Sequence, residues 1–271
     1  MELKTIIKMK FLYKTFTLLF FIIALSNCKK DTKAPEPEEQ TAPVITPAGS
    51  LQIEFEGMVG DSDLVLSTAT YTNQAGNTFN VTLCKYYISN IKITKTDNTV
   101  WAEPNSYHLV DYSNPLSTIL EIPNVPYADY KAIEFMLGVD SARNVSGAQT
   151  GALDPTNGMF WSWNSGYIMA KVEGTSPQST ATANALTFHV GGFKGATSAL
   201  KVFSPSFGGS LANVSSTIIP KIHLKADILE WFQTPTAINF ATLNTVHMPG
   251  TDAKSIADNY ADMFSVEHIH N

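Results

Sequence analysis

Hydrophobic and polar positions alternate along much of this chain with the period of a β-strand. Leu51, Ile53 and Phe55 alternate with Gln52, Glu54 and Glu56, which places one face in a core and the other in solvent. The same alternation recurs between turn-forming residues. We predict further strands at 86–94, 107–111, 118–122, 130–139, 167–173, 186–190 and 218–224. Many short strands without alternating helices predict an all-β fold, an antiparallel β-sandwich.

Two segments near the C-terminus depart from the strand pattern. Residues 226–232 form a short apolar segment that we interpret as a helix. In residues 252–264, apolar side chains recur at intervals of four and three, which predicts an amphipathic helix with Thr251 or Asp252 as its N-cap. Residues 141–158 are rich in glycine and lead into an aromatic strand. We expect an elaborated loop there, and such loops on a rigid sheet are frequent binding sites.

The N-terminal segment predicts export. Four lysines precede the apolar run 16–25, the order of charge and apolar region found in a secretory signal. The run is too short for an ordinary membrane-spanning helix. It ends at Leu-Ser-Asn-Cys, which resembles a bacterial lipobox and predicts lipidation of Cys28. An uncleaved anchor is the alternative, and both interpretations place the domain outside the cytosol.

The chain divides into three predicted parts. These are a lipoprotein signal peptide (1–27), a flexible tether rich in Pro and Glu (28–48) and a β-sandwich domain (49–271). We therefore expect a cell-envelope protein held in the outer membrane through Cys28. Removal of the signal changes the formal charge from −6 to −9, because four lysines and one glutamate are lost. Such a surface repels nucleic acid.

Catalytic signatures are missing from the sequence. There is no Gly-x-Ser-x-Gly elbow, no His-Glu-x-x-His, no phosphate loop and no dinucleotide fingerprint. We therefore expect a binding protein rather than an enzyme. Once Cys28 is lipidated, Cys84 is the one cysteine left, so stability must come from packing and not from an intramolecular disulfide.

The histidines are the best candidate metal ligands, since neutral imidazole suits copper and zinc. Residues i and i+2 of an extended chain point the same way, so His268 and His270 can reach one ion. A polar C-terminal tail is the alternative interpretation of this pair. His189 and His223 each lie within a predicted strand and are candidates to complete a nitrogen site, or else ordinary surface histidines.

The tryptophans form a second unusual group. Trp161 and Trp163 share one face of the strand that follows the long loop. A core aromatic pair explains them without any function.

The stretch 138–174 contains Leu-Asp-Pro-x-x-Gly-Met-Phe-Trp-x-Trp-x-x-Gly-Tyr at 153–167, and Phe-His-Val-Gly-Gly follows at 188–192. These motifs resemble the MbnP-like copper-binding family, the methanobactin-associated periplasmic proteins. The looser resemblance extends from Leu51 to the C-terminus. It implies a β-sandwich that binds one copper ion through histidines, with His189 as the carried-over ligand. It also implies a tryptophan, Trp161 or Trp163, that a partner di-haem peroxidase oxidises to kynurenine. The cysteines of some family members are missing here.

Two other functions compete with copper binding. A surface module could bind carbohydrate or protein through exposed aromatics, with Trp101 beside Trp161 and Trp163. A metal-dependent hydrolase would need carboxylates beside the histidines, and Glu267 and Asp227 are the local candidates. Exposure separates the first of these from copper binding: buried tryptophans near converging histidines favour a metal, and a flat exposed aromatic row favours a glycan.

Overall fold

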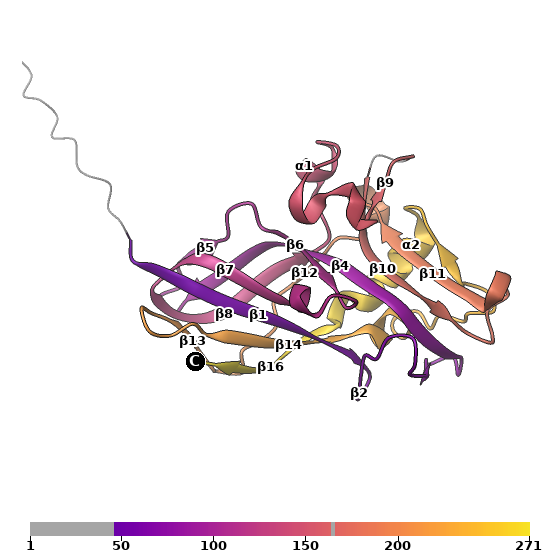
Figure 1. The fold of residues 1–271 in the computed structure, drawn as a ribbon, viewed down its shortest axis with the longest axis horizontal. Coiled ribbons are helices and arrows are strands. Elements are labelled where there is room, and N and C mark those ends of the chain that lie inside the picture. The colour runs from indigo at the N-terminus through magenta and orange to yellow at the C-terminus, as the bar shows by residue number, and fades with distance from the viewer. Residues whose placement is uncertain (1–45, 164–165) are drawn as a thin grey trace, which may run out of the picture. The chain divides into compact units, whose positions relative to one another are not determined.

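The computed structural model describes residues 46–163 and 166–271, in which two curled β-sheets form a sandwich (Figure 1). The smaller sheet runs in the order β16-β14-β1-β2, and β7 pairs with the other edge of β1. Its strands are β1 (Ala48–Val59), β2 (Ser62–Asp63), β7 (Ile119–Pro126), β14 (Lys221–Asp227) and β16 (Phe264–His270).

The larger sheet has eleven strands and follows the path β12-β8-β4-β10-β11-β15. Its members are β3 (Tyr71–Thr72), β4 (Thr78–Lys95), β5 (Val100–Ala102), β6 (Tyr107–Asp111), β8 (Ala128–Leu137), β9 (Phe160–Trp161), β10 (Gly166–Thr175), β11 (Ala185–Gly191), β12 (Lys201–Phe203), β13 (Ala212–Val214) and β15 (Thr245–Val246). The long β4 is the spine of this sheet, because β3, β5, β6, β8 and β10 all pair with it.

The predicted β-sandwich is confirmed, but its sheets are mixed rather than purely antiparallel. β1 runs parallel to β14, and β11 runs parallel to β15. Both pairs join segments far apart in the sequence, so no hairpin turn forces them to be antiparallel. Each strand predicted from the alternation overlaps an observed strand.

The helices differ from the sequence prediction. Residues 226–232 are not an α-helix: Asp227 ends β14, and the 3₁₀ turn η6 (Ile228–Phe232) follows. The second helix, α2 (Thr251–Asn259), has Gly250 as its N-cap instead of Thr251 or Asp252. It also ends five residues earlier than predicted, because Phe264 already belongs to β16.

Short helical turns complete the fold. They are α1 (Ser141–Asn144), η1 (Pro115–Thr118), η2 (Gly151–Leu153), η3 (Pro155–Asn157), η4 (Thr182–Asn184), η5 (Gly195–Thr197) and η7 (Tyr260–Asp262). Three of them, α1, η2 and η3, lie in the loop that the glycine-rich stretch 141–158 predicted. Within the described ranges, no helix is long and apolar enough to cross a bilayer. The predicted signal peptide, Cys28 and nearly all of the tether lie outside the described residues.

An aromatic cluster centred on Phe264 joins the two sheets. The ring of Phe264 lies 5.6 Å from that of Phe55 in its own sheet. It also contacts three rings of the larger sheet, those of Tyr86 at 5.6 Å, Phe135 at 5.2 Å and Phe203 at 4.7 Å. Edge-to-face pairs of this kind add to the free energy of simple burial. The first residue of the C-terminal strand is therefore fixed in the core.

We expect Phe264→Ala to lower the free energy of unfolding by about 3–5 kcal/mol, because it removes a buried ring from four aromatic contacts and leaves a cavity. Urea unfolding followed by circular dichroism measures the change. The control is Val202→Ala on β12, where the side chain is 57% exposed and the change should stay within about 0.5 kcal/mol. Equal stability of the two variants would contradict the central role of this ring.

Candidate metal centre

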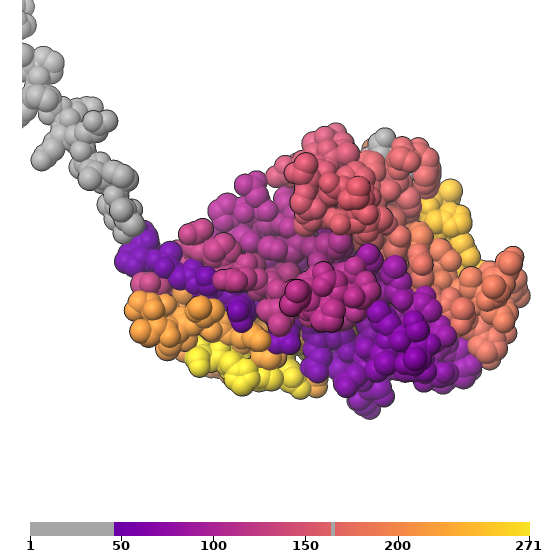
Figure 2. Space-filling model, viewed as in Figure 1, coloured from indigo at the N-terminus to yellow at the C-terminus, as the bar shows by residue number. Residues whose placement is uncertain are grey.

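Three histidines converge on the solvent-facing side of the smaller sheet. His223 is on β14, and His268 and His270 are on the neighbouring strand β16. One ring nitrogen from each residue lies within 4.8 Å of a ring nitrogen of each of the others. β16 is the edge strand, and its yellow residues lie at the surface beside the orange segment in the space-filling view (Figure 2). The cluster is thus on a rigid sheet and open to solvent.

A β-bulge at Glu267 sets the side on which the two C-terminal histidines lie. Leu224 pairs with Val266 and His223 pairs with His268, so Glu267 has no partner on β14. In a regular strand, His268 and His270 would share a face with Phe264 and Val266, which face the core. The extra residue reverses the alternation after Val266. Ile269 then pairs with the buried Ile222, and both histidines point outward beside His223.

The ring geometry is close. The Nε2 atoms of His268 and His270 are 3.0 Å apart. The rings of His223 and His268 stack with centroids 4.1 Å apart, and the centroid of His270 lies 5.0 Å from that of His223. Three imidazoles with nitrogens at these separations match the donor set that copper and zinc prefer.

Carboxylates face the other side of two of these rings. Glu54 on β1 is opposite His223 in the parallel register, and its Oε2 lies 3.4 Å from His223 Nδ1. Glu267 Oε2 lies 3.3 Å from His268 Nδ1, and its second oxygen contacts Lys225 at 2.8 Å. A carboxylate at Nδ1 favours the tautomer that keeps its proton there, which leaves the Nε2 lone pair free. Metal-binding histidines commonly have such a partner.

His223 has the least accessible nitrogen of the three. Its Nε2 is buried and has no hydrogen-bond partner, which is uncommon for a buried polar atom. Burial lowers the pKa of His223; Glu54 opposes this effect, and the neighbouring His268 and Lys221 add to it. The lowered pKa favours the neutral ring, the form of imidazole that binds metals.

A groove of about 470 Å³ opens beside the histidines. His223 and His268 form part of its wall, and three carboxylates, Glu54, Glu56 and Glu267, line it as well. The remaining lining residues are Phe55, Gly57, Tyr112, Pro115 and Thr118. Pro115 and Thr118 are the first and last residues of the 3₁₀ turn η1. Two of these carboxylates are paired with lysines, Glu54 with Lys221 at 3.1 Å and Glu267 with Lys225 at 2.8 Å.

The structure does not place His189 with the other three predicted ligands. His189 is on β11 of the larger sheet, where its Nε2 lies 2.7 Å from Glu173 Oε1. Burial lowers the pKa of His189, and Glu173 opposes that effect. The sequence alternation could not separate these sites, because it gives the face of each strand but not the sheet to which the strand belongs.

The two tryptophans lie near His189 in the larger sheet. Trp161 is 6% exposed, and its ring covers Gly191, two residues after His189 on β11. Trp163 is 62% exposed, and its ring centroid lies 5.6 Å from that of Trp161. The predicted shared strand face is wrong, because β9 ends at Trp161 and Trp163 lies in the turn that follows. The pair consists of one buried indole on the strand and one exposed indole in the turn.

The two remaining histidines lie outside the three-histidine cluster. His108 is paired with Glu103 at 2.9 Å, and His247 follows the short strand β15, whose parallel pairing with β11 places it beside His189. Cys84 is fully buried, and burial raises the pKa of its thiol far above the usual range. Sequence reasoning missed Glu54 as a neighbour of the histidines. The solvent-facing alternation of β1 was visible, but the parallel pairing that brings it to β14 was not.

A model of the MbnP family matches residues 48–249. The chain belongs to the MbnP family. The resemblance stated from the motif at 153–167 is thus confirmed. The matched region contains His189, His223 and both tryptophans of the motif, whereas His268 and His270 follow it.

A solved structure has a similar fold. It is MbnP from Methylosinus trichosporium, which aligns with a TM-score of 0.50 and 10% sequence identity over 76% of this chain and 83% of that one. At this identity the likeness shows the fold alone. No curated protein matches the sequence.

We expect Gly191→Ala to displace the indole of Trp161, because an added Cβ would lie 2.6 Å from Trp161 Cη2. The overpacking should cost about 1–3 kcal/mol of stability and shift the tryptophan emission to the red as the ring becomes exposed. Gly250→Ala is the control, since its Cβ would meet no atom within 4 Å. Unchanged emission in Gly191→Ala would contradict this packing.

Proposed function

We propose that this MbnP-family protein binds a copper ion in the cell envelope through His223, His268 and His270. The observation that supports this most directly is the convergence of one ring nitrogen from each histidine within 4.8 Å. The three side chains would hold the ion, and the site would serve in copper acquisition or handling. No catalytic step is part of the proposal.

The donor chemistry of the site fits a metal ion. The buried, unpartnered Nε2 of His223 is a lone pair that a bound cation would satisfy. Glu54 and Glu267 would hold the two rings in the orientation that presents Nε2 to the ion. Each of these carboxylates also pairs with a lysine, Lys221 or Lys225, so its part in the proposed site would be to orient a ring.

Copper is our choice of metal on two grounds. Three imidazoles are suitable ligands for both copper and zinc, and among divalent ions Cu(II) binds such ligands more tightly than Zn(II). The resemblance carried by the motif at 153–167 also implies copper. The choice of copper therefore depends on the affinity order and on the family resemblance, whereas the location of the site depends on the geometry of the three histidines.

The envelope location follows from the N-terminus in this proposal. Lipidation of Cys28 would anchor the protein to the outer membrane, and residues 28–48 would tether the domain whose first strand starts at Ala48. Detection of a diacylglyceryl group on Cys28 by mass spectrometry of membrane-extracted protein would test this part.

Oxidation of a tryptophan to kynurenine by a di-haem peroxidase is a separate part of the proposal. Trp163 is the better candidate of the two, because its exposed ring is accessible to a partner protein and Trp161 is covered. The reaction would take place beside His189 on the larger sheet and not at the three histidines. Mass spectrometry of protein from the native host tests it, and intact indoles at both positions would exclude it.

The competing carbohydrate-binding function has weaker support. A stacking platform needs a flat row of exposed rings, but Trp161 is buried and Trp101 is half-buried. Of these three tryptophans, Trp163 alone has an exposed ring, and one ring does not form a row.

We expect the mature chain, purified in detergent, to bind one Cu(I) ion in anaerobic competition with a chelator. His223→Ala and the double variant His268→Ala/His270→Ala should each weaken binding by at least roughly 100-fold, because loss of a ligand exceeds the effect of losing its outer partner. His108→Ala is the control, since this histidine is paired with Glu103 and lies outside the cluster. His189→Ala tests the carried-over ligand in the same assay. A loss confined to His189→Ala would move the site to the larger sheet.

We expect Glu54→Gln and Glu267→Gln to weaken the same binding by about 10–100-fold each. The amide keeps the size of the side chain but removes the charge that faces each Nδ1 atom. Glu121→Gln is the matched control, because Glu121 is a solvent-exposed residue on β7 of the same sheet. Equal affinities of all three variants and the parent would show that these carboxylates do not orient the rings.

A further inference from the structure

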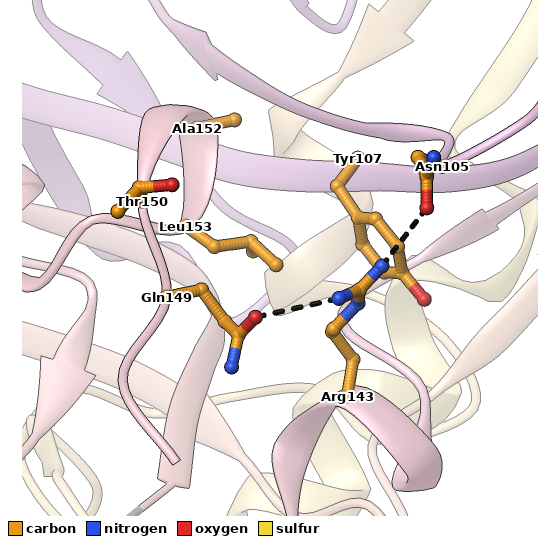
Figure 3. Close-up of a pocket in the computed structure, with 7 residues that line it drawn as sticks. All are labelled: Asn105, Tyr107, Arg143, Gln149, Thr150, Ala152 and Leu153. Atoms are coloured by element: carbon orange, nitrogen blue, oxygen red, sulfur yellow. Dashed lines mark hydrogen bonds between the residues drawn. The ribbon is translucent and has the colours of Figure 1, made fainter. Parts of the chain in front are cut away.

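The loop between β8 and β10 contains a second, separate pocket. Its volume is about 310 Å³, at the small end of the range for ligand sites. Asn105, Tyr107, Arg143, Gln149, Thr150, Ala152 and Leu153 line it (Figure 3). The pocket is built from the β5–β6 connection, from β6, and from the 141–158 loop. Its chemistry differs from that of the histidine site, because its one charged lining residue is an arginine.

Arg143 is the single arginine among the 18 lysine and arginine residues of the chain. Lysine and arginine both carry a positive charge, but only the guanidinium offers a planar fork of N–H donors. All the other basic residues, histidines aside, are lysines, so the one guanidinium of the chain lies in this pocket.

Neutral groups hold the guanidinium in place. Nη1 donates to Gln149 Oε1 at 3.3 Å, and Nη2 donates to Asn105 Oδ1 at 3.2 Å. The guanidinium carbon lies 5.0 Å from the centre of the Tyr107 ring. Figure 3 shows the arginine between the two amide oxygens and against this ring. The head group is therefore oriented before any ligand arrives.

The charge of Arg143 has no carboxylate partner among the described residues. None of the ion pairs found in residues 46–163 and 166–271 includes this arginine. Its nearest acidic neighbour in sequence, Asp140, uses its oxygens for the backbone N–H of Arg143, for Asn90 and for the hydroxyl of Tyr107. A guanidinium has five N–H donors, and two amide oxygens leave donors free.

The side-chain amide of Gln149 is itself held by hydrogen bonds. The side-chain nitrogen of Gln149 donates to Ser146 and to the backbone oxygen of Gly147, and its backbone N–H donates to the hydroxyl of Tyr167. This network forces Oε1 of Gln149 toward Arg143. The rest of the lining consists of the apolar side chains of Leu153 and Ala152 and the polar side chain of Thr150.

We propose that this pocket binds the carboxylate group of a small organic acid through Arg143, with the apolar part of the acid against Tyr107 and Leu153. A planar carboxylate matches the two parallel donors of a guanidinium. A phosphate dianion would need more positive charge than one arginine supplies. The site is independent of the proposed copper centre, because it shares no residue with it and belongs to the 141–158 loop.

Calorimetric titration of the mature chain with benzoate tests the assignment, with benzamide as the uncharged isostere and inorganic phosphate as the competing anion. We expect saturable one-to-one binding of benzoate, no binding of benzamide, and phosphate binding at least roughly tenfold weaker than benzoate. Arg143→Gln should weaken benzoate binding at least roughly tenfold, since it removes the charge-assisted hydrogen bonds.

One further variant keeps the test valid even where Arg143→Gln disturbs the loop. Asn105→Asp preserves the shape of the side chain but places a carboxylate against Arg143, so it should abolish benzoate binding while the thermal unfolding midpoint stays near that of the parent. Lys131→Gln, an exposed surface change, is the control and should bind benzoate as the parent does.

Three outcomes would overturn the proposal. The first is no saturable heat with benzoate at about 10 mM, a concentration that saturates a site of millimolar Kd. The second is benzoate binding that survives in Asn105→Asp. The third is phosphate or benzamide binding as tight as that of benzoate, which would show that the pocket does not select a carboxylate.

Discussion

The packing of Phe264 between the two sheets is the interaction on which the proposed site depends. This ring contacts four other aromatic rings from both layers of the sandwich. It holds the first residue of β16 in the core, so the strand leaves the core in one direction and pairs with β14 along its length. Without that anchor, the last seven residues would be a polar chain end with no defined position for its histidines.

Pairing across three strands then assembles the histidine cluster. Glu54, His223 and His268 occupy adjacent positions on β1, β14 and β16, and they form a row across the sheet. Such cross-strand neighbours are the close contacts of a sheet. The bulge at Glu267 keeps the row on the solvent side, while Ile269 and Val266 stay against the core side. One extra residue thus separates the ligands from the hydrophobic residues of the same strand.

Three chemically distinct regions of the protein are distributed over the two sheets and the 141–158 loop. The motif that defines the family places Trp161 over Gly191 of the larger sheet, close to His189. The three-histidine cluster lies on the smaller sheet, and two of its members follow the region that the family model matches. The Arg143 pocket belongs to the loop that leads into the tryptophan motif. The histidine cluster shares no residue with the other two regions, so its function can be measured separately. The pocket and the motif are connected, because Leu153 belongs to both and the hydroxyl of Tyr167 accepts a hydrogen bond from the backbone N–H of Gln149.

The sequence by itself determined the class of fold and most of the strands, since alternation with a period of two depends only on which side chains are apolar. It also determined the family through the motif at 153–167, and it singled out His223, His268 and His270 as candidates. It did not reveal the end of α2 or the η6 turn, where Phe264 and Asp227 follow the tertiary packing rather than local propensity.

Only the tertiary structure decided which candidates meet. The parallel pairing of β1 with β14 joins segments separated by most of the chain, and no local pattern encodes that register. The bulge at Glu267 reverses the alternation that the sequence suggests, and the sheet to which β11 belongs removes His189 from the cluster. Spacing along a strand fixes the direction of a side chain relative to its neighbours, but the position of that strand depends on contacts with distant residues.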